Sequence, residues 1–333
     1  MLQISKLSHG LLLLAGVSLT CPSGSAFATV VASIRPLGFI AAAIAEGVMP
    51  VEVLLPDGAS PHNYALRPSD IQRLRAADLV IWVGPKMESS LTKALIPVTD
   101  NKKIALSELP AVKPLLIKNE QKQLLSYIAK GIDKEENEDD DYHAKNYAKN
   151  HGKNHGDKHF HGDYNMHIWL SLSIVKQAAI AIHYQLSESM PQNRDKLDTN
   201  LRQFELQLTQ TEKNVATTMK FVHGKGYFVF HDAFSYFENH FGLAPLGYFT
   251  VNPEITPGPR RLYQIRKQLI QKKAVCVFSE PQFRPAVIDT VIKDTGVRSG
   301  TLDPFGGGVA LNKDGYANFL FQLSRQYVRC LSE

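Results

Sequence analysis

Short segments rich in β-branched residues alternate with helical stretches along the chain, and this alternation restricts the fold more than any other feature. Strands that are separated by helices pair in parallel, and parallel sheets are covered by helices on both faces. The sequence therefore predicts an α/β fold. In the first part of the chain we expect strands at residues 29–34, 51–55 and 78–83, and helices at residues 36–46, from 69 or 70 onward, and at 87–95.

The alternation returns in the second part of the chain, where it predicts a second parallel sheet flanked by helices. No sequence repeat links the two series. We expect strands at residues 227–230, 274–278 and 297–302, an extended segment at 243–250, and helices from about 233 and at 259–271, 285–294 and 316–328.

A long amphipathic helix is expected between the two series, at residues 191–219, after a shorter helix at residues 172–186. Its apolar residues recur at helical spacing, which predicts one stripe packed against a core. A continuous helix of this length also predicts a rigid link between two lobes. The stripe consists of Leu197, Leu201, Phe204, Leu208, Val215 and Met219.

The length of 333 residues exceeds what one hydrophobic core usually organises, so we expect two α/β lobes. Parallel sheets bind ligands at the carboxyl ends of their strands, which predicts a cleft between the lobes. The expected divisions are a signal peptide at 1–28, an N-terminal lobe at 29–190 with an insertion at about 118–163, a linking helix at 191–219 and a C-terminal lobe at 220–333.

The N-terminus has the three parts of a secretory signal peptide. Lys6 supplies the positive region, residues 11–20 the apolar region, and residues 26–28 (Ala-Phe-Ala) the cleavage site. We expect cleavage after Ala28 and export of the mature chain. Acylation of Cys21 as a lipoprotein is the alternative, which the good cleavage site disfavours. No later segment is apolar for long enough to span a bilayer. We expect the exported chain to be soluble and monomeric.

The charge distribution argues against a nucleic acid as partner. The net charge is only +5, and the basic residues are scattered rather than gathered beside aromatic residues. Surfaces that bind nucleic acid are strongly basic and concentrated on one face. We therefore expect no nucleic-acid partner.

Export with loss of Cys21 leaves two cysteines, Cys276 and Cys330. Two cysteines in an oxidising compartment usually pair. Closing a loop of this length stabilises a fold by roughly 4 kcal/mol in the chain-entropy description. Two buried free thiols are the alternative, which the apolar run at residues 274–278 keeps open.

A histidine-rich segment, residues 143–167, covers the end of the expected insertion and the point where it rejoins the folded chain, and it cannot form an apolar core of its own. An acidic run at residues 135–141 precedes it. Imidazole suits Zn, Cu and Ni, so a loop crowded with histidine predicts loose metal binding. A solvated polar insertion without metal is the alternative. The histidines of this segment are His143, His151, His155, His159, His161 and His167.

Three histidines are candidate ligands of a single metal ion. His62 follows the strand at 51–55 through a loop rich in glycine and proline, and His231 follows the strand at 227–230 directly. His167 lies where the insertion rejoins the folded chain. Three imidazoles from three loops suit a tetrahedral Zn²⁺ with one position open. Each histidine taken alone is more often a surface or core residue than a ligand.

Asp232, directly after His231, has two interpretations that the sequence does not separate. Its carboxylate can orient the His231 ring by a hydrogen bond, or it can cap the helix that begins near residue 233. The short motifs HExxH, paired CxxC and GxSxG are absent from the chain, so the sequence contains none of these familiar catalytic patterns.

Five short motifs are specific in combination: Gly58-Ala59-Ser60-Pro61-His62, Leu66-Arg67-Pro68-Ser69-Asp70, Phe230-His231-Asp232-Ala233-Phe234, Glu280-Pro281-Gln282-Phe283-Arg284-Pro285 and Gly300-Thr301-Leu302-Asp303-Pro304. With the acidic, histidine-rich insertion they resemble the zinc-specific solute-binding proteins of bacterial ABC importers, the ZnuA type. The resemblance covers about residues 30–331. It implies a periplasmic protein of two α/β lobes joined by one long rigid helix, and it matches Cys276 and Cys330 to a disulfide of the zinc group.

The resemblance also implies a zinc site. His62, His167 and His231 match the family's ligands. Asp303 matches a carboxylate ligand of related manganese-binding members and is therefore a candidate fourth ligand. Glu280 matches a residue that supports a ligand or the fold. Manganese relatives typically have a carboxylate where this chain has His231, and a third imidazole favours Zn²⁺ over the harder Mn²⁺.

The function implied by the resemblance is the capture of periplasmic Zn²⁺, as the transported ligand, and its delivery to an inner-membrane ABC permease with a cytoplasmic ATPase. The histidine-rich segment would collect zinc at low affinity or report that the periplasm is replete. A periplasmic zinc buffer without a transporter is one alternative. A zinc hydrolase or hydratase is another, because three histidines and a water molecule also form catalytic zinc sites.

Overall fold

The structure is a computed structural model that describes residues 28–119, 163–250, 253–254, 257–283 and 286–332. Residues 1–27 of the predicted signal peptide and the histidines from His143 to His161 lie outside these ranges. Among the described residues, no helix combines the length and the apolarity that crossing a bilayer requires.

The first sheet has four parallel strands in the order β2-β1-β3-β4. The three predicted strands are confirmed, and β4 is an addition. It is an edge strand of three residues around the buried Ile104, which is too short for a period-two pattern to be recognised in the sequence. The elements are β1 (Val30–Ala32), α1 (Arg35–Ile44), β2 (Val51–Val53), α2 (Pro68–Ala76), β3 (Leu79–Trp82), α3 (Ser89–Ala94) and β4 (Lys103–Ala105).

The second sheet repeats this arrangement, with four parallel strands in the order β6-β5-β7-β8. The two sheets share one topology although no sequence repeat links them. The expected elements are all present, with shifts of a few residues at their ends. They are β5 (Tyr227–Val229), α8 (Ser235–Phe241), β6 (Gly247–Tyr248), α9 (Pro259–Gln271), β7 (Cys276–Ser279), α10 (Ala286–Ile292), β8 (Arg298–Thr301) and α11 (Gly315–Leu331).

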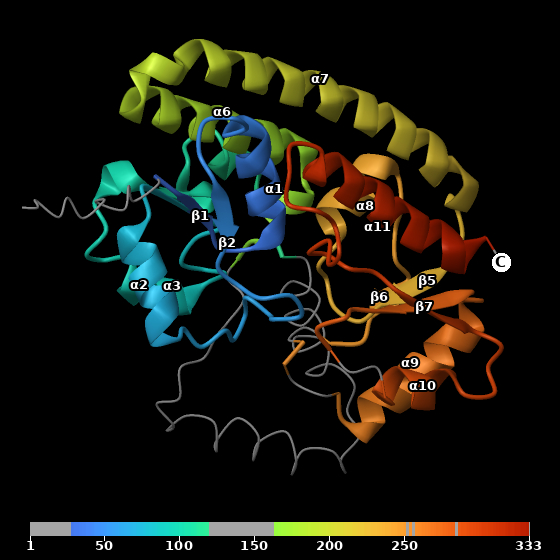
Figure 1. Cartoon of the computed structure of the whole chain (residues 1–333). Coiled ribbons are helices and arrows are strands. Elements are labelled where there is room, and N and C mark those ends of the chain that lie inside the picture. Colours follow the sequence, from blue (N-terminus) through green and yellow to red (C-terminus); the bar gives the residue numbers. More distant parts are fainter. Residues whose placement is uncertain (1–27, 120–162, 251–252, 255–256, 284–285, 333) are drawn as a thin grey trace, which may run out of the picture.

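The predicted long helix is α7 (Arg194–Met219), which follows α6 (Leu172–Ser189) after one turn of 3₁₀ helix at Pro191–Asn193. Figure 1 shows α7 extending along one side of the molecule above both sheets. Five of the six residues of its predicted stripe are buried, and Leu201 is partly buried. The prediction of two parallel sheets flanked by helices, with one long helix, is confirmed.

Polar contacts fix α7 to both halves of the fold. The Asn200 amide donates to the carbonyl oxygens of Ile44 and Glu46, at 2.8 and 2.9 Å, and so satisfies the end of α1. Gln207 donates to Asp314, just before α11, at 2.8 Å. Because α7 contacts α1, α6 and α11, it packs against helices from both halves in addition to connecting the two βα series along the chain.

The hydrophobic core is continuous across the two halves. One cluster of buried side chains includes β1, β3, α6, α7, α11 and the side of the second sheet that faces them. A smaller cluster lies between the second sheet and helices α9 and α10, with Phe228, Ile265 and Ile288 among its members. The two sheets are therefore held by shared apolar packing, which the length of the chain alone did not predict.

The predicted disulfide is confirmed. Cys276 in β7 is bonded to Cys330 in α11, with a Cα–Cα distance of 6.1 Å across a sequence separation of 54 residues. Both residues are buried, so the alternative of two free thiols is wrong. The Arg298 guanidinium donates to the Cys330 carbonyl oxygen at 2.6 and 3.0 Å. The end of α11 is thus fastened to the second sheet by covalent and polar contacts.

A buried carboxyl group lies in the second half, beneath α11. Glu238 of α8 is almost fully buried, and its Oε1 accepts hydrogen bonds from the hydroxyls of Tyr227 and Tyr327, at 2.8 and 3.0 Å. Burial raises the pKa of Glu238 to about 8, although the two tyrosine hydroxyls act in the opposite direction. The folded protein therefore retains a proton here at neutral pH.

This proton makes the stability of the fold depend on pH. The unfolded side chain releases its proton near pH 4.5, whereas the folded one holds it to about pH 8. The stabilisation from the buried protonated acid is complete below pH 4.5 and is lost as the pH rises toward about 8. We expect the Glu238 contribution to the free energy of unfolding to fall by about 2 kcal/mol between pH 6 and 8.

Urea unfolding of the wild type and of Glu238→Gln across this pH range measures the effect, because glutamine is a neutral isostere of the protonated acid. The variant should show the shallower decline in the free energy of unfolding. Glu188→Gln, at an exposed position of α6, is the control and should leave the slope unchanged. Equal slopes for wild type and Glu238→Gln would contradict a protonated buried acid.

Candidate metal centre

The three histidines predicted as ligands come together in the structure. His62 lies in the loop after β2, His231 lies two residues past the end of β5, and His167 immediately precedes a 3₁₀ turn at Ile168–Leu170. One nitrogen from each ring lies within 4.8 Å of the other two. His167 and His231 are 4% and 3% exposed, and His62 is partly exposed. The cluster therefore has two buried imidazoles and one nearer the solvent.

The spacing of the nitrogens suits a small ion. Nε2 of His231 and Nε2 of His167 are 3.3 Å apart. Two nitrogens on one tetrahedral Zn²⁺, each at about 2.0–2.1 Å from the ion, would be separated by about 3.3–3.4 Å. The ring centroids of the three pairs are 5.1 to 5.7 Å apart, so His62 completes a triangle. These rings need little rearrangement to share a single ion.

A buried carboxylate orients His231. Oε1 of Glu280 lies 2.5 Å from Nδ1 of His231, and both side chains are buried. A hydrogen bond from Nδ1 leaves Nε2 free to face the other two rings and makes it a stronger ligand. Burial raises the pKa of Glu280, and the neighbouring His231 acts in the opposite direction. Glu280 therefore holds the ring of His231, a candidate ligand, through a buried hydrogen bond.

A neutral amide orients His167 in the same way. Oδ1 of Asn165 lies 2.8 Å from Nδ1 of His167 and also accepts a hydrogen bond from its backbone N–H at 3.0 Å. The Asn165 side chain then donates to the carbonyl oxygen of Asp232 across the two halves, at 3.0 Å. The prediction missed Asn165, since its only signal in the sequence is its place two residues before His167.

Asp232 occupies a different position from the one that would orient His231. Its Oδ1 accepts a hydrogen bond from the hydroxyl of Ser235, the first residue of α8. The Nδ1 atom of His231 faces Glu280 instead. The contact with Glu280 excludes Asp232 as the partner of Nδ1. The residue at the N-cap position of α8 is Phe234, without a side-chain cap hydrogen bond, so the observed contact of Asp232 with the Ser235 hydroxyl is not the predicted helix cap.

The candidate fourth ligand, Asp303, is buried but is not part of the histidine group found among the described residues. Its Oδ1 accepts from the backbone N–H of Phe305 at 2.9 Å, and its Oδ2 accepts from that of Gly307 at 2.6 Å. A Cβ at position 307 would lie 2.9 Å from Oδ2, so only glycine allows this approach. In this position the Asp303 carboxylate stabilises its own loop by accepting both backbone hydrogen bonds.

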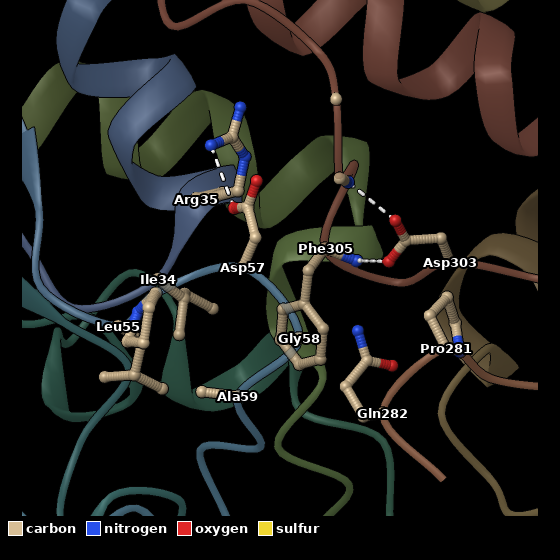
Figure 2. Close-up of a pocket in the computed structure, with 13 residues that line it drawn as sticks. Ile34, Arg35, Leu55, Asp57, Gly58, Ala59, Pro281, Gln282, Asp303 and Phe305 are labelled. Atoms are coloured by element: carbon tan, nitrogen blue, oxygen red, sulfur yellow. Dashed lines mark hydrogen bonds and ion pairs between the residues drawn. The ribbon is translucent and has the colours of Figure 1, made fainter. Parts of the chain in front are cut away.

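A cavity of about 290 Å³ opens between the two halves beside these residues. Figure 2 shows Arg35 and Asp57 on one side, Asp303 on the other, and Gln282 and Phe305 between them. The Arg35 guanidinium donates to Asp57 at 3.0 Å and also to the carbonyl oxygen of Val309 in the second half. The cavity is therefore lined from both halves, although none of the three histidines is among the described residues that line it.

The loop that carries His62 is held from across the cleft. Glu254, in the segment before α9, accepts from the Ser60 hydroxyl at 3.2 Å and from the Asn63 amide at 2.5 Å. The Ser60 oxygen in turn accepts from the backbone N–H of His62 at 3.3 Å. His62, the most exposed of the three clustered histidines, thus lies in a loop that a residue of the second half holds in place.

The ends of the insertion are joined close to the cluster. Lys118 and Tyr164 form an antiparallel bridge, and the backbone N–H of Asn119 donates to Asp163 at 2.9 Å. Tyr164 is three residues from His167. His143, His151, His155, His159 and His161 belong to the segment between these ends and lie outside the described residues.

Sequence comparison places the chain among zinc-uptake proteins. The profile of the family described as "Zinc-uptake complex component A periplasmic", ZnuA, matches residues 30–330. A high-affinity zinc uptake system protein ZnuA of Yersinia pestis is 62% identical over 333 residues, covering 99% of this chain and all of that protein. The protein of the same description from Haemophilus influenzae is 38% identical, covering 92% of this chain and 94% of its own.

Solved structures share the fold at lower sequence identity. A crystal structure of a ZnuA aligns with a TM-score of 0.70 at 20% identity, covering 91% of this chain and 99% of that one. The periplasmic zinc-binding protein TroA of Treponema pallidum aligns with a TM-score of 0.70 at 17% identity, covering 92% and 99%. With a profile that matches nearly the whole described fold and relatives above 30% identity, the chain belongs to the ZnuA family of periplasmic zinc-uptake components.

Proposed function

We propose that this protein captures Zn²⁺ in the periplasm and delivers it to an ABC importer. The observation that carries the proposal is the convergence of His62, His167 and His231 in a member of the ZnuA family. Imidazole is a preferred ligand of Zn²⁺, and the nitrogen spacing fits a tetrahedral ion. The ion is the transported substrate, held between the two halves.

In this proposal the three histidines bind the ion through nitrogens that face one another, while Glu280 and Asn165 hold the rings of His231 and His167. A small ligand such as water supplies the fourth position. Asp303 would have to give up two backbone hydrogen bonds to reach the ion, which makes it the weaker candidate for that position.

The two sheets with their helices would then act as the lobes at residues 29–190 and 220–333, linked by the helix at 191–219. Binding across a cleft lets a change in the relation between lobes, or in one ligand loop, release the ion. The His62 loop is the natural point of release, because His62 is the most exposed of the three ligands and is held through Glu254. We propose that docking to the permease shifts this loop.

The histidine-rich insertion would supply a second, weaker class of zinc site. Its ends are joined at Lys118 and Tyr164, and Tyr164 is three residues from His167, so the insertion enters and leaves the fold next to this candidate ligand. The insertion would either collect zinc for the cluster or report that zinc is abundant. The signal peptide, cleaved after Ala28, would place the chain in the compartment that the family name describes.

The alternatives differ in the fate of the ion once it is bound. A zinc buffer would bind the ion equally well and pass it to no transporter. A zinc hydrolase or hydratase would turn over a substrate at the same ligand set. The match to zinc-uptake proteins over nearly the whole chain supports transport over both.

Delivery is tested with proteoliposomes that contain the cognate permease and its ATPase. We expect ATP-dependent zinc accumulation that requires the zinc-loaded protein, and no accumulation with His231→Ala. Tight zinc binding by the protein without any transfer would instead support a buffer. Hydrolysis of a simple ester or hydration of carbon dioxide by the zinc-loaded protein would support an enzyme.

The same assay with residues 135–161 deleted separates the insertion from the cluster. We expect fewer zinc ions bound per chain, one tight site retained, and delivery preserved at saturating zinc. Loss of tight binding in this deletion would show that the proposed division between insertion and cluster is wrong.

A further inference from the structure

The most basic stretch of the described chain is α9 with the two lysines that follow it. Residues 259–273 contain six basic residues and no acidic one. Since the net charge of the whole chain is +5, the remaining residues together sum to −1. The expectation of scattered basic residues is therefore wrong for this helix. The six are Arg260, Arg261, Arg266, Lys267, Lys272 and Lys273.

Carboxylates do not neutralise this charge within the described residues. Arg261, Arg266 and Lys272 donate to backbone carbonyl oxygens of neighbouring segments. The acidic residues of the adjacent α10 region, Asp289 and Asp294, are exposed and form no ion pair with them in the described chain. The six positive charges thus have no carboxylate partner within the described residues, and three of them, on Arg260, Lys267 and Lys273, also form no hydrogen bond to the backbone there.

The exposed face of α9 mixes cations with an aromatic and an aliphatic side chain. At 3.6 residues per turn, Arg260, Tyr263, Lys267 and Ile270 fall on the side opposite the buried Ile265. Tyr263 is 71% exposed and Ile270 is 57% exposed. These two side chains therefore lie on the same exposed face as two cations, Arg260 and Lys267, that form no ion pair within the described chain.

The position of α9 relates this surface to the metal centre. Figure 1 shows α9 and α10 at the end of the molecule away from α7. The segment leading into α9 contains Glu254, which contacts the His62 loop across the cleft. The beginning of α9 is therefore five residues from a contact that holds the His62 loop.

We propose that the exposed face of α9 (Arg260, Tyr263, Lys267 and Ile270) binds the anionic surface of a lipid bilayer. Cations attract headgroup phosphates, and tyrosine and isoleucine side chains settle among headgroups and the adjoining acyl region. Because the apolar face of α9 is buried in the fold, the binding is peripheral and reversible. The interaction brings the protein to the membrane that contains its importer and does not depend on zinc.

Co-sedimentation with vesicles tests the proposal without zinc or permease. The wild type should bind vesicles of equal parts phosphatidylglycerol and phosphatidylcholine at 50 mM salt, binding should fall at 300 mM, and phosphatidylcholine alone should bind little. Arg260→Gln with Lys267→Gln should lower the partition coefficient at least about tenfold, since each cation near an anionic surface contributes about fivefold. Tyr263→Ser should weaken binding at constant charge.

The control is Lys213→Gln with Lys220→Gln, which changes the net charge equally at exposed positions of α7 and the turn after it. It should retain vesicle binding. Equal loss in this control, or no wild-type binding to the anionic vesicles at low salt, would overturn the proposal. So would an α9 variant that binds vesicles normally but fails in permease-dependent uptake, because α9 would then recognise a protein. Zinc titration of the α9 variant should match the wild type, which separates this outcome from a failure of zinc capture.

Discussion

Replacing His167 or His231 with alanine should weaken zinc binding about 100-fold or more. Zinc sites in small proteins bind with an apparent free energy on the order of 10 kcal/mol, shared among their ligands, so one of three imidazoles accounts for about 3 kcal/mol. Both rings are buried and are held by Glu280 and Asn165, so no other side chain can take their place without rearrangement. Titration of the mature protein against a competing zinc chelator measures both affinity and stoichiometry.

His240→Ala is the matched control for these variants. His240 lies on α8, is partly exposed and is paired with Glu212 at 2.8 Å, away from the cluster. Its loss should leave the tight site unchanged. If His167→Ala or His231→Ala binds zinc as tightly as this control does, the three histidines are not the ligands of one ion.

Glu280→Gln should give a smaller loss, about 10- to 100-fold, which is the range for residues that orient a metal ligand. Glutamine retains an oxygen that can accept from Nδ1 of His231 but removes the negative charge that strengthens the ligand. The order of affinities should therefore be wild type, then Glu280→Gln, then His231→Ala. An affinity for Glu280→Gln below that of His231→Ala would mean that Glu280 itself binds the ion.

Removing the disulfide should lower the free energy of unfolding by about 4 kcal/mol. The bond between Cys276 and Cys330 closes a loop with a sequence separation of 54 residues. The chain-entropy description assigns about 4 kcal/mol to a loop of this size, because the cross-link restricts the unfolded chain. Urea unfolding of the double variant Cys276→Ala, Cys330→Ala, compared with the oxidised wild type, measures this loss.

The reduced wild type is the matched control, because it has the same side chains without the cross-link. Most of the loss should already be present in it, and the reductant should have no effect on the double variant. Equal free energies of unfolding for the oxidised and reduced wild type would show that the cross-link does not stabilise this fold.

The order of strands and helices could be predicted from the sequence because their side-chain patterns are local. The stripe of α7 and the apolar strands β1, β3, β5 and β7 carry the periods of a helix and of buried strands. The strand β4 was not predicted, because it is formed by pairing beside β3 at the sheet edge and has no pattern of its own. Its existence depends on a neighbour about 20 residues away in sequence.

The sequence predicted which histidines are candidate ligands and where they lie along the chain, but their distances from one another come only from the structure. His62 and His231 follow strands that belong to different sheets, and 105 residues separate His62 from His167. Parallel strands place their carboxyl ends at one edge, which made a shared site plausible. The relation between the two sheets, however, depends on a core that extends across both halves, and no sequence period describes such packing.

The sequence by itself determined the two βα series, the long helix, the paired cysteines and the three histidines, because each is a property of residue type and spacing. Only the tertiary structure decided that Glu280 rather than Asp232 faces Nδ1 of His231, and that Asn165 holds His167. It also decided that both carboxylate oxygens of Asp303 accept hydrogen bonds from backbone N–H groups of its own loop. Hydrogen bonds of this kind form only between atoms about 3 Å apart. Residues distant in sequence reach that separation only when the chain is packed into its tertiary structure.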